Sequence, residues 1–300
     1  MKKEVKRAII LIIIVGLIVV GIKGIQGFDK TKKDLKKHGY SKEEISLIVE
    51  KIDKAKIKDI LAIEYSDKLD DILKETYYIP DHLMDYLNLS KTNNNINEVV
   101  SKVNVNSYKD WYTDAVKTKV DENLKMLVNK FNYLDETYKP NDIVNIPEEY
   151  AYANHKIKEE VYSQYKKMWK EAKKEGLTLI VTSSYRDFDE QKKEYDAAND
   201  DYAAKPGFSE HQTGLALDIV TYDTQGNDFE NKKEFLWLQD NADKYGFILR
   251  YPKDKENITG YAYESWHYRY VGTTLASKVK TSNLTFDEYH AYFCDYKKEC

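Results

Sequence analysis

Apolar residues in the first part of the chain recur at helical spacing between charged residues. The recurring positions are Leu35, Ile45, Ile48, Val49 and Ile52. Ser41 and Glu44 have the spacing of a capping box, which predicts the start of a helix. Residues 91–97 are polar and predict a loop. The pattern over residues 29–121 therefore predicts a charged helical region, and this stretch of sequence holds no cluster of histidines and acidic residues.

From about residue 122 onwards, β-branched and alternating runs lie between helical patterns. Four runs predict strands, at residues 177–182, 215–220, 247–251 and 265–271. Helices are predicted from residue 157 to Gly176, over residues 189–199 and over residues 235–245. Because helices and strands mix without regular βαβ alternation, we predict an α+β fold in which helices flank a small antiparallel sheet.

The start of the chain has a different pattern. Residues 1–7 are basic, and residues 8–22 contain no polar side chain. These 15 residues would span about 22 Å as a helix, and extension to Phe28 gives about 21 residues, enough for the ~30 Å core of a membrane. The basic flank predicts a cytoplasmic N-terminus and an exported body. We therefore expect residues 1–28 to be a single-pass membrane anchor. A cleaved signal sequence, giving a secreted form, is the alternative, although no convincing cleavage motif follows the segment.

Composition limits the partners of the remaining chain. Hydrophobic residues make up 42% and charged residues 33%, and the formal net charge is −4. Acidic and basic residues are interspersed, which argues against a nucleic-acid-binding surface. We also expect no nucleotide cofactor. The only two cysteines, Cys294 and Cys300, lie in the last seven residues, where they either form a disulfide or remain free.

Two short segments carry the candidate chemistry. His211 lies in a glycine-punctuated loop, and Asp218 follows it inside an apolar strand, where a carboxylate needs a cation or several hydrogen-bond donors. Glu264 and His267 stand three residues apart. Two imidazoles and one carboxylate suit zinc and leave a fourth position for water, while Glu264 would take the proton of that water. Each segment alone is more often structural, but together they complete a ligand set and a base.

The other four histidines have no such company, and we expect them at the surface. They are His38, His82, His155 and His290.

The pattern Ser-x-His-x-x-Gly-x-Ala-x-Asp at residues 209–218, followed by Glu-x-x-His at residues 264–267, resembles the zinc D-alanyl-D-alanine carboxypeptidases of the VanY type, in the M15 group of metallopeptidases. The resemblance covers about residues 122–280. It implies one zinc ion per chain, held by His211, Asp218 and His267, with Glu264 as catalytic base.

The resemblance extends upstream to Ser184, Arg186 and Gln191. It implies that Arg186 binds the carboxylate of the substrate or stabilises the oxyanion, and that Ser184, Gln191 and Ser209 contact the substrate. An arginine fork suits a free terminal carboxylate on physical grounds as well. An ordinary surface ion pair of Arg186 with Asp187 or Asp189 is the alternative.

The implied function is hydrolysis of the C-terminal D-alanine peptide bond of peptidoglycan stem peptides, with D,D- and L,D-specificity both open. The implied location is the bacterial cell membrane, with a catalytic domain at residues 122–300 outside it and residues 29–121 as a spacer or wall-facing module. One rival is a serine D,D-peptidase, because Ser163 and Ser277 each precede a lysine by three residues, but its companion motifs are absent. The other is a peptidoglycan-binding or scaffolding protein with structural zinc, which would have no use for Glu264.

Overall fold

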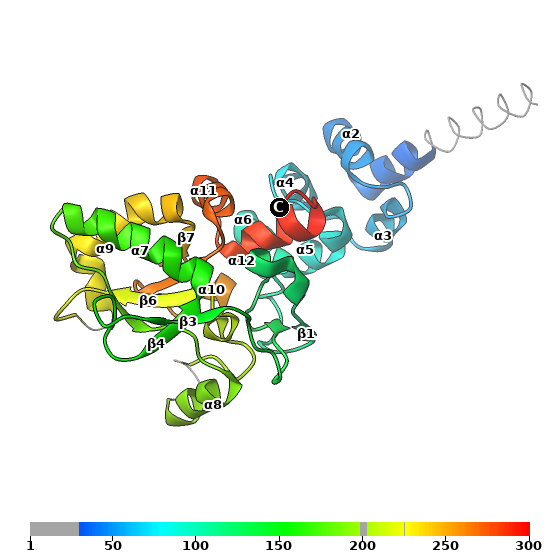
Figure 1. Ribbon diagram of the computed structural model, residues 1–300. Coiled ribbons are helices and arrows are strands. Elements are labelled where there is room, and N and C mark those ends of the chain that lie inside the picture. Colours follow the sequence, from blue (N-terminus) through cyan, green and yellow to red (C-terminus); the bar gives the residue numbers. More distant parts are fainter. Residues whose placement is uncertain (1–29, 199–202, 225) are drawn as a thin grey trace, which may run out of the picture. The chain divides into compact units, whose positions relative to one another are not determined.

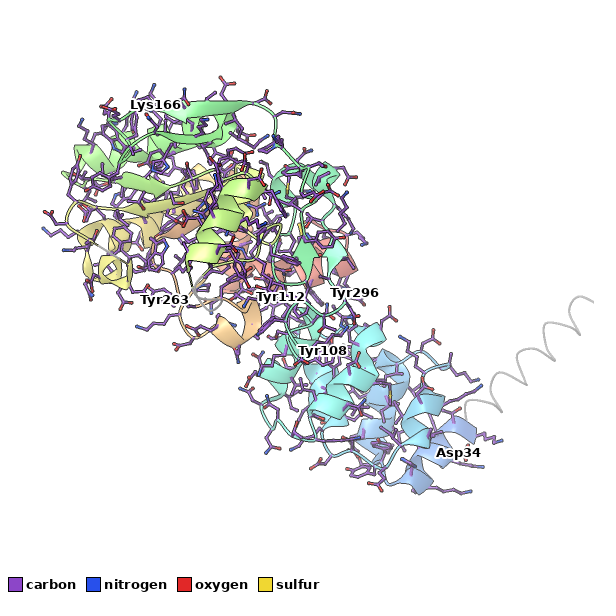
Figure 2. All side chains as sticks on the ribbon, turned by 90° about the horizontal axis from the view of Figure 1, so that it is seen from below. Asp34, Tyr108, Tyr112, Lys166, Tyr263 and Tyr296 are labelled. Carbon is purple, nitrogen blue, oxygen red and sulfur yellow. A yellow bond between two sulfur atoms is a disulfide. The ribbon has the colours of Figure 1, made fainter. Side chains whose placement is uncertain are left out.

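The structure, a computed structural model, describes residues 30–198, 203–224 and 226–300 (Figure 1). The chain forms two compact units, residues 1–100 and 101–300. Figure 2 shows their side chains, with Asp34 in the first unit and Lys166 and Tyr263 in the second.

The described part of the first unit is helical, as predicted. Its elements are residues 30–38, α2 (Lys42–Lys51), α3 (Ile57–Ala62), α4 (Leu69–Lys74), η1 (Pro80–His82), α5 (Leu83–Leu89) and α6 (Ile96–Asn104), which runs on into the second unit. The predicted capping box begins α2, because the Ser41 hydroxyl accepts from the Glu44 N–H and the Glu44 carboxylate accepts from the Ser41 N–H. Apolar side chains on the inner helix faces form a small core; among them Leu35, Ile48 and Ile60 are buried.

None of the helices among the described residues is both long and apolar enough to cross a membrane. Even α7 (Glu159–Lys174) has only 16 residues and would span about 24 Å, short of the ~30 Å hydrocarbon core. The predicted single-pass membrane location is contradicted by this finding. Residues 8–28, on which the prediction depended, lie outside the described residues.

The second unit is built on a four-stranded antiparallel sheet with the strand order β5-β6-β8-β7. The strands are β5 (Ile180–Ser183), β6 (Ala216–Val220), β7 (Phe247–Leu249) and β8 (His267–Tyr270). All four lie within the predicted runs, except that β5 extends one residue further. The predicted α+β class is therefore correct for this part of the chain.

Helices and short strands surround this sheet. The helices are α7, α8 (Phe188–Ala197), α9 (Lys233–Asn241), α10 (Glu256–Thr259), α11 (Thr273–Ser282) and α12 (Phe286–Tyr289). The remaining strands are β1 (Val116–Lys117), β2 (Asn132–Tyr133), β3 (Ile143–Ile146) and β4 (His155–Lys158). The helical turns are η2 (Val120–Lys125), η3 (Glu210–Thr213), η4 (Gly226–Asn231), η5 (Ala242–Tyr245) and η6 (His290–Tyr296).

The main core lies on one face of the sheet, beneath α7 and α9 (Figure 1). Leu217 and Ile219 of β6 point into it, and Tyr165 and Met168 of α7 meet them there; none of the four has measurable exposure. Since strand side chains alternate, this burial turns Asp218 toward the opposite face of the sheet.

The second unit starts at Ser101, about 20 residues before the predicted start at residue 122. The reason is local pairing, because β1 pairs in parallel with β2 and so ties residues 116–117 to residues 132–133 of the second unit. At the other end of the unit, Cys294 and Cys300 form a disulfide, which answers the question that the sequence left open.

Candidate active site

Two of the predicted site residues face each other across the middle of the sheet. Asp218 of β6 and His267 of β8 are direct partners in the antiparallel register. Side chains at such positions project from the same face about 5 Å apart at Cβ, so both reach one point in space. The distance from Asp218 Oδ1 to His267 Nδ1 is 3.0 Å. The sheet register thus builds half of the site.

His211 reaches the same point from η3. The Ser209 hydroxyl accepts from the His211 N–H and begins this turn, and Gly214 ends it in the left-handed conformation with φ of 68°. A Cβ at Gly214 would lie 3.0–3.3 Å from three neighbouring side chains, so both space and backbone favour glycine. The serine and glycine of the motif therefore hold His211 in place.

One hydrogen bond fixes the orientation of the His211 ring. Its Nδ1 lies 2.7 Å from the Ser184 carbonyl oxygen, to which it donates, so Nε2 keeps its lone pair. That Nε2 lies 3.4 Å from Asp218 Oδ1. Burial, followed by the nearby Arg186 guanidinium, lowers the pKa of His211 to about 4, which keeps the ring neutral and able to bind a metal.

The ligand atoms of His211, Asp218 and His267 lie within 4.8 Å of one another. Two ligands of a tetrahedral zinc ion, each about 2.0–2.1 Å from it, lie about 3.4 Å apart, close to the two distances to Asp218. Asp218 Oδ1 is buried and has no hydrogen-bond partner among the described residues. Such an oxygen is costly unless a cation satisfies it, so these three residues fit a zinc ion.

Glu264 lies beside this cluster without being part of it. Its Oε2 is 3.5 Å from His267 Nδ1, and its side chain is 21% exposed, toward the cavity. Burial raises the pKa of Glu264 to about 7 in the metal-free protein. A bound cation would favour the charged form and lower that pKa. A carboxyl group whose pKa lies between its ordinary value and about 7 can accept a proton and return it near neutral pH.

The cluster opens into a cavity of about 220 Å³. Arg186, Gln191 and Ser209 line it together with the three candidate ligands and Glu264. The Arg186 Nε donates to Gln191 Oε1 at 2.9 Å, and Gln191 Nε2 donates in turn to the Ala204 carbonyl at 2.8 Å. Arg186 is thus held at the cavity wall by the side chain that the motif places five residues later.

The alternative of a surface ion pair for Arg186 is not what the structure shows. Among the described residues Arg186 makes no ion pair with Asp187, which instead caps α8 by accepting from the Glu190 N–H. Ser184 is not among the residues lining the cavity. Its hydroxyl lies 3.1 Å from His155 Nδ1, and its contribution to the site is the carbonyl that orients His211.

Several residues at the site were not predicted. Tyr251, Tyr261, Trp266 and Glu210 also line the cavity, and the Glu210 carboxylate lies 3.6 Å from His267 Nε2. Aromatic residues are common in strands and loops, so the sequence offers no signal that separates these from the many core tyrosines. Glu210 had one available signal, its position directly before a ligand histidine.

The expectation for the remaining histidines is wrong at one position. His290 is buried, with Nδ1 3.1 Å from Asp295 Oδ2, because the C-terminal helical segment packs its ring near Phe286. His155 is half-buried, against Ser184.

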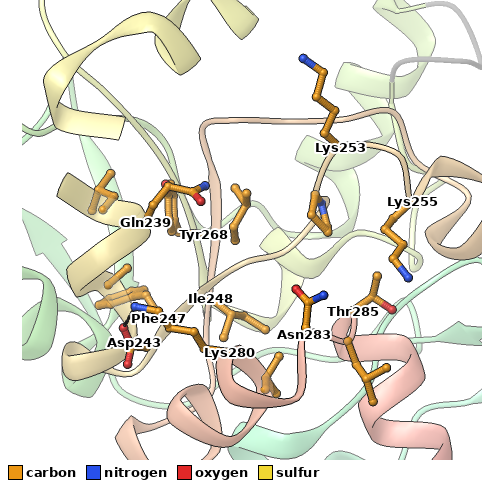
Figure 3. Close-up of a pocket in the computed structure, with 16 residues that line it drawn as sticks. Gln239, Asp243, Phe247, Ile248, Lys253, Lys255, Tyr268, Lys280, Asn283 and Thr285 are labelled. Atoms are coloured by element: carbon orange, nitrogen blue, oxygen red, sulfur yellow. Dashed lines mark hydrogen bonds and ion pairs between the residues drawn. The ribbon is translucent and has the colours of Figure 1, made fainter. Parts of the chain in front are cut away.

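Other hollows of the second unit lack this chemistry. A cavity of about 380 Å³ lies along the edge strand β7, between α9, η5 and α11 (Figure 3). Its three lysines are all paired: Lys253 with Glu230, Lys255 with Glu288 and Lys280 with Asp243. The serines of the two Ser-x-x-Lys patterns, at 163 in α7 and 277 in α11, are exposed and line neither cavity.

Comparison with known proteins agrees with this geometry. Residues 154–273 match the family described as VanY: D-alanyl-D-alanine carboxypeptidase. The chain is 42% identical over 186 residues to YodJ of Bacillus subtilis (strain 168), which covers 56% of this chain and 67% of YodJ. It is 33% identical to the bifunctional D-Ala-D-Ala dipeptidase and D-Ala-D-Ala carboxypeptidase VanXYC of Enterococcus gallinarum, covering 57% of this chain and 95% of VanXYC.

Among solved structures, that of the LdcB LD-carboxypeptidase, described as revealing the molecular basis of peptidoglycan recognition, is 39% identical with a TM-score of 0.55. The match covers 60% of this chain and 91% of that one. These matches confirm the predicted enzyme class, a carboxypeptidase, and family membership together with the His211, Asp218 and His267 cluster supports the predicted zinc cofactor. The chain belongs to the VanY family of D-alanyl-D-alanine carboxypeptidases.

Proposed function

We propose that this chain is a zinc carboxypeptidase that removes the C-terminal D-alanine from peptidoglycan stem peptides. The observation that carries the proposal is the convergence of His211, Asp218 and His267 on one point at the end of a cavity that also holds Glu264 and Arg186. The activities for which VanXYC and LdcB are named, together with family membership, support the class of substrate.

Each residue of the site has a separate role in the proposed reaction. The chemistry that a zinc ion supplies there is Lewis acidity toward the scissile carbonyl and toward water. Glu264 takes the proton of the attacking water and returns it to the leaving amino group of D-alanine. Arg186, held by Gln191, donates from its guanidinium to the terminal carboxylate and so orients the peptide bond. The hydroxyl of Ser209 already caps η3, so its role is to hold His211 as well as to line the cavity.

The cavity, of about 220 Å³, has room for a terminal residue with its carboxylate. The cavity does not separate a D,D- from an L,D-carboxypeptidase. VanXYC is named for D-Ala-D-Ala activity and LdcB for LD-carboxypeptidase activity, so both substrates belong in the test.

The test is incubation of the full chain with pentapeptide and tetrapeptide muropeptides, with and without a chelator, followed by mass spectrometry. We expect loss of one D-alanine from at least one substrate, its abolition by the chelator and its recovery with added zinc. Insensitivity to β-lactams would separate this activity from a serine peptidase. Binding of muropeptides without release of alanine would overturn the proposal in favour of a scaffolding protein with structural zinc.

A further inference from the structure

Four charged side chains are buried directly behind the metal cluster, and the proposed mechanism uses none of them. Arg250 and Arg269 are fully buried, Glu210 is 1% exposed and Asp287 is 2% exposed. Removing ions from water costs several kcal/mol each unless good pairing offsets it. The two arginines and the two carboxylates carry equal and opposite charge, and their contacts show which side chain they hold in place.

The contacts form a chain that ends on Glu210. The Nη1 and Nη2 atoms of Arg250 donate to both oxygens of Asp287, at 2.5 and 3.1 Å, in a two-pronged pair. Arg250 Nε and Arg269 Nη1 both donate to the same oxygen, Oε1 of Glu210, at 2.8 Å each. Two guanidinium groups that donate to one oxygen hold Glu210 as a carboxylate. With Oε1 held twice, this carboxylate cannot turn.

The second oxygen of Glu210 faces His267. Glu210 Oε2 lies 3.6 Å from His267 Nε2, and neither atom has a hydrogen-bond partner among the described residues. Closing the gap by about 0.7 Å would make a hydrogen bond of ordinary length. The other nitrogen of this imidazole, Nδ1, is the one that lies 3.0 Å from Asp218. The ring of His267 therefore lies between two carboxylates with different tasks.

We infer that Glu210 is the positioning residue of the metal ligand His267, accepting its Nε2–H so that the Nδ1 lone pair faces the metal, and that Arg250, Arg269 and Asp287 hold Glu210 in that position. The inference rests on the proposed function, since it takes His267 as a ligand. A carboxylate on the far nitrogen of a ligand imidazole fixes the tautomer and raises the basicity of the ring.

The two arginines lie within residues 154–273, the segment that matches the family, but the residues that hold the arginines lie outside it. Asp287 belongs to α12, and the Phe286 ring beside it lies under both guanidinium groups, at 5.6 Å from Arg250 and 5.5 Å from Arg269. On the N-terminal side, Asn129 Nδ2 donates to Asp287 Oδ1 at 2.8 Å. The C-terminal helix thus acts on the metal site through three charged side chains.

The competing explanation is that these charges only stabilise the core. Asp287 has a matched control next to it in Glu288, which is also buried, pairs with Lys255 at 3.2 Å and caps α12 through Thr285. Asp287→Asn and Glu288→Gln each turn a buried, paired carboxylate of the same helix into an amide. Only Asp287 is connected to His267.

The test measures zinc affinity by chelator competition on the full chain for wild type, Glu210→Gln, Asp287→Asn and Glu288→Gln, with thermal unfolding alongside. We expect Glu210→Gln to bind zinc about 10–100-fold more weakly, Asp287→Asn to show a smaller loss in the same direction, and Glu288→Gln to keep wild-type affinity at reduced thermal stability. In ¹⁵N NMR of the zinc-loaded protein, the protected Nε2–H of His267 should be present in wild type and lost in Glu210→Gln.

Wild-type zinc affinity in folded Glu210→Gln would overturn the inference. So would an equal loss in Asp287→Asn and Glu288→Gln, which would mark a general effect of stability. If Glu210→Gln does not fold, the zinc affinity of Asp287→Asn, compared with that of Glu288→Gln, tests the inference. Failure of the proposed function has a different signature: zinc binding by the wild type would then be absent, or would survive His267→Ala.

Discussion

Replacement of Glu264 by glutamine separates metal binding from turnover. The change removes the proton acceptor and leaves His211, Asp218 and His267, whose ligand atoms lie within 4.8 Å of one another, as they are. We expect the variant to keep one zinc ion per chain and to lose turnover by about 10²–10⁴-fold, the usual contribution of a general base. That loss corresponds to about 3–5 kcal/mol in the activation barrier. Zinc content and D-alanine release measured on the same sample give both values.

The same variant predicts a change in the stability of the metal-free protein. Burial raises the pKa of Glu264 from its ordinary 4.5 to about 7. The folded state then binds this proton more tightly than the unfolded state, so the stabilisation is fully present below about pH 4.5 and is lost as pH rises through 7. The difference in pKa corresponds to about 3 kcal/mol. Glutamine does not titrate, so the metal-free variant should be more stable than metal-free wild type at pH 8 and lose this advantage towards pH 4.5.

The control is Glu230→Gln. Glu230 is a partly buried carboxylate that pairs with Lys253 at 3.4 Å and does not line the active-site cavity, so its loss should leave zinc content and turnover unchanged. Near-normal turnover by Glu264→Gln would refute its role as the base. Loss of zinc from that variant would instead make Glu264 a ligand. Urea unfolding in chelator at several pH values tests the stability, and a constant gap between variant and wild type would refute the pKa argument.

Three further substitutions test separate parts of the site. His267→Ala should lose zinc together with turnover, and a variant that keeps one zinc per chain would exclude His267 as a ligand. Arg186→Lys keeps the positive charge but loses the planar guanidinium. It should lower kcat/KM about 10–100-fold for peptides with a free C-terminal carboxylate and much less for peptides with a C-terminal amide. An equal effect on both substrates would show that Arg186 does not bind the terminal carboxylate. Leu217→Ala empties a fully buried position in the core and should cost about 2–5 kcal/mol of unfolding free energy in urea while zinc content stays unchanged; zinc loss in the folded variant would contradict this division between the two faces of the sheet.

The sequence predicted those features that local pattern determines. The apolar run around Asp218 and the aromatic run around His267 became neighbouring strands, and the capping spacing at Ser41 became a helix start. The sequence offers no signal for a boundary at Ser101, because β1 has only two residues and its pairing with β2 leaves no periodicity to read. Residues 8–28 looked apolar enough for a membrane helix, but the described helices contain none that could span a membrane.

The residues of the site divide in the same way. A ligand set can be recognised from residue types and spacing, whereas the role of Ser184 depends on which of its atoms faces the site. The Ser184 hydroxyl contacts His155, and the Ser184 carbonyl orients His211. A sequence motif does not show whether a side chain or a backbone atom of a residue faces the site. Glu210 resembled an ordinary charged residue of a loop, and only the fold shows both arginines on one of its oxygens.

The alternation of β8 explains why the two faces of this sheet have different tasks. Tyr268 and Tyr270 belong to the apolar core, whereas His267 and Arg269, two residues apart, share the face that carries the metal cluster and its buried carboxylate. Asp218 and Ala216 pair with them from β6, so the polar face is built from alternate residues of both strands. A slip of one residue would exchange the two faces, placing the aromatic rings in the site and the charges in the core. The apolar packing beneath α7 therefore fixes the register that brings His267 to Asp218, and the hydrophobic core and the metal site depend on the same pairing.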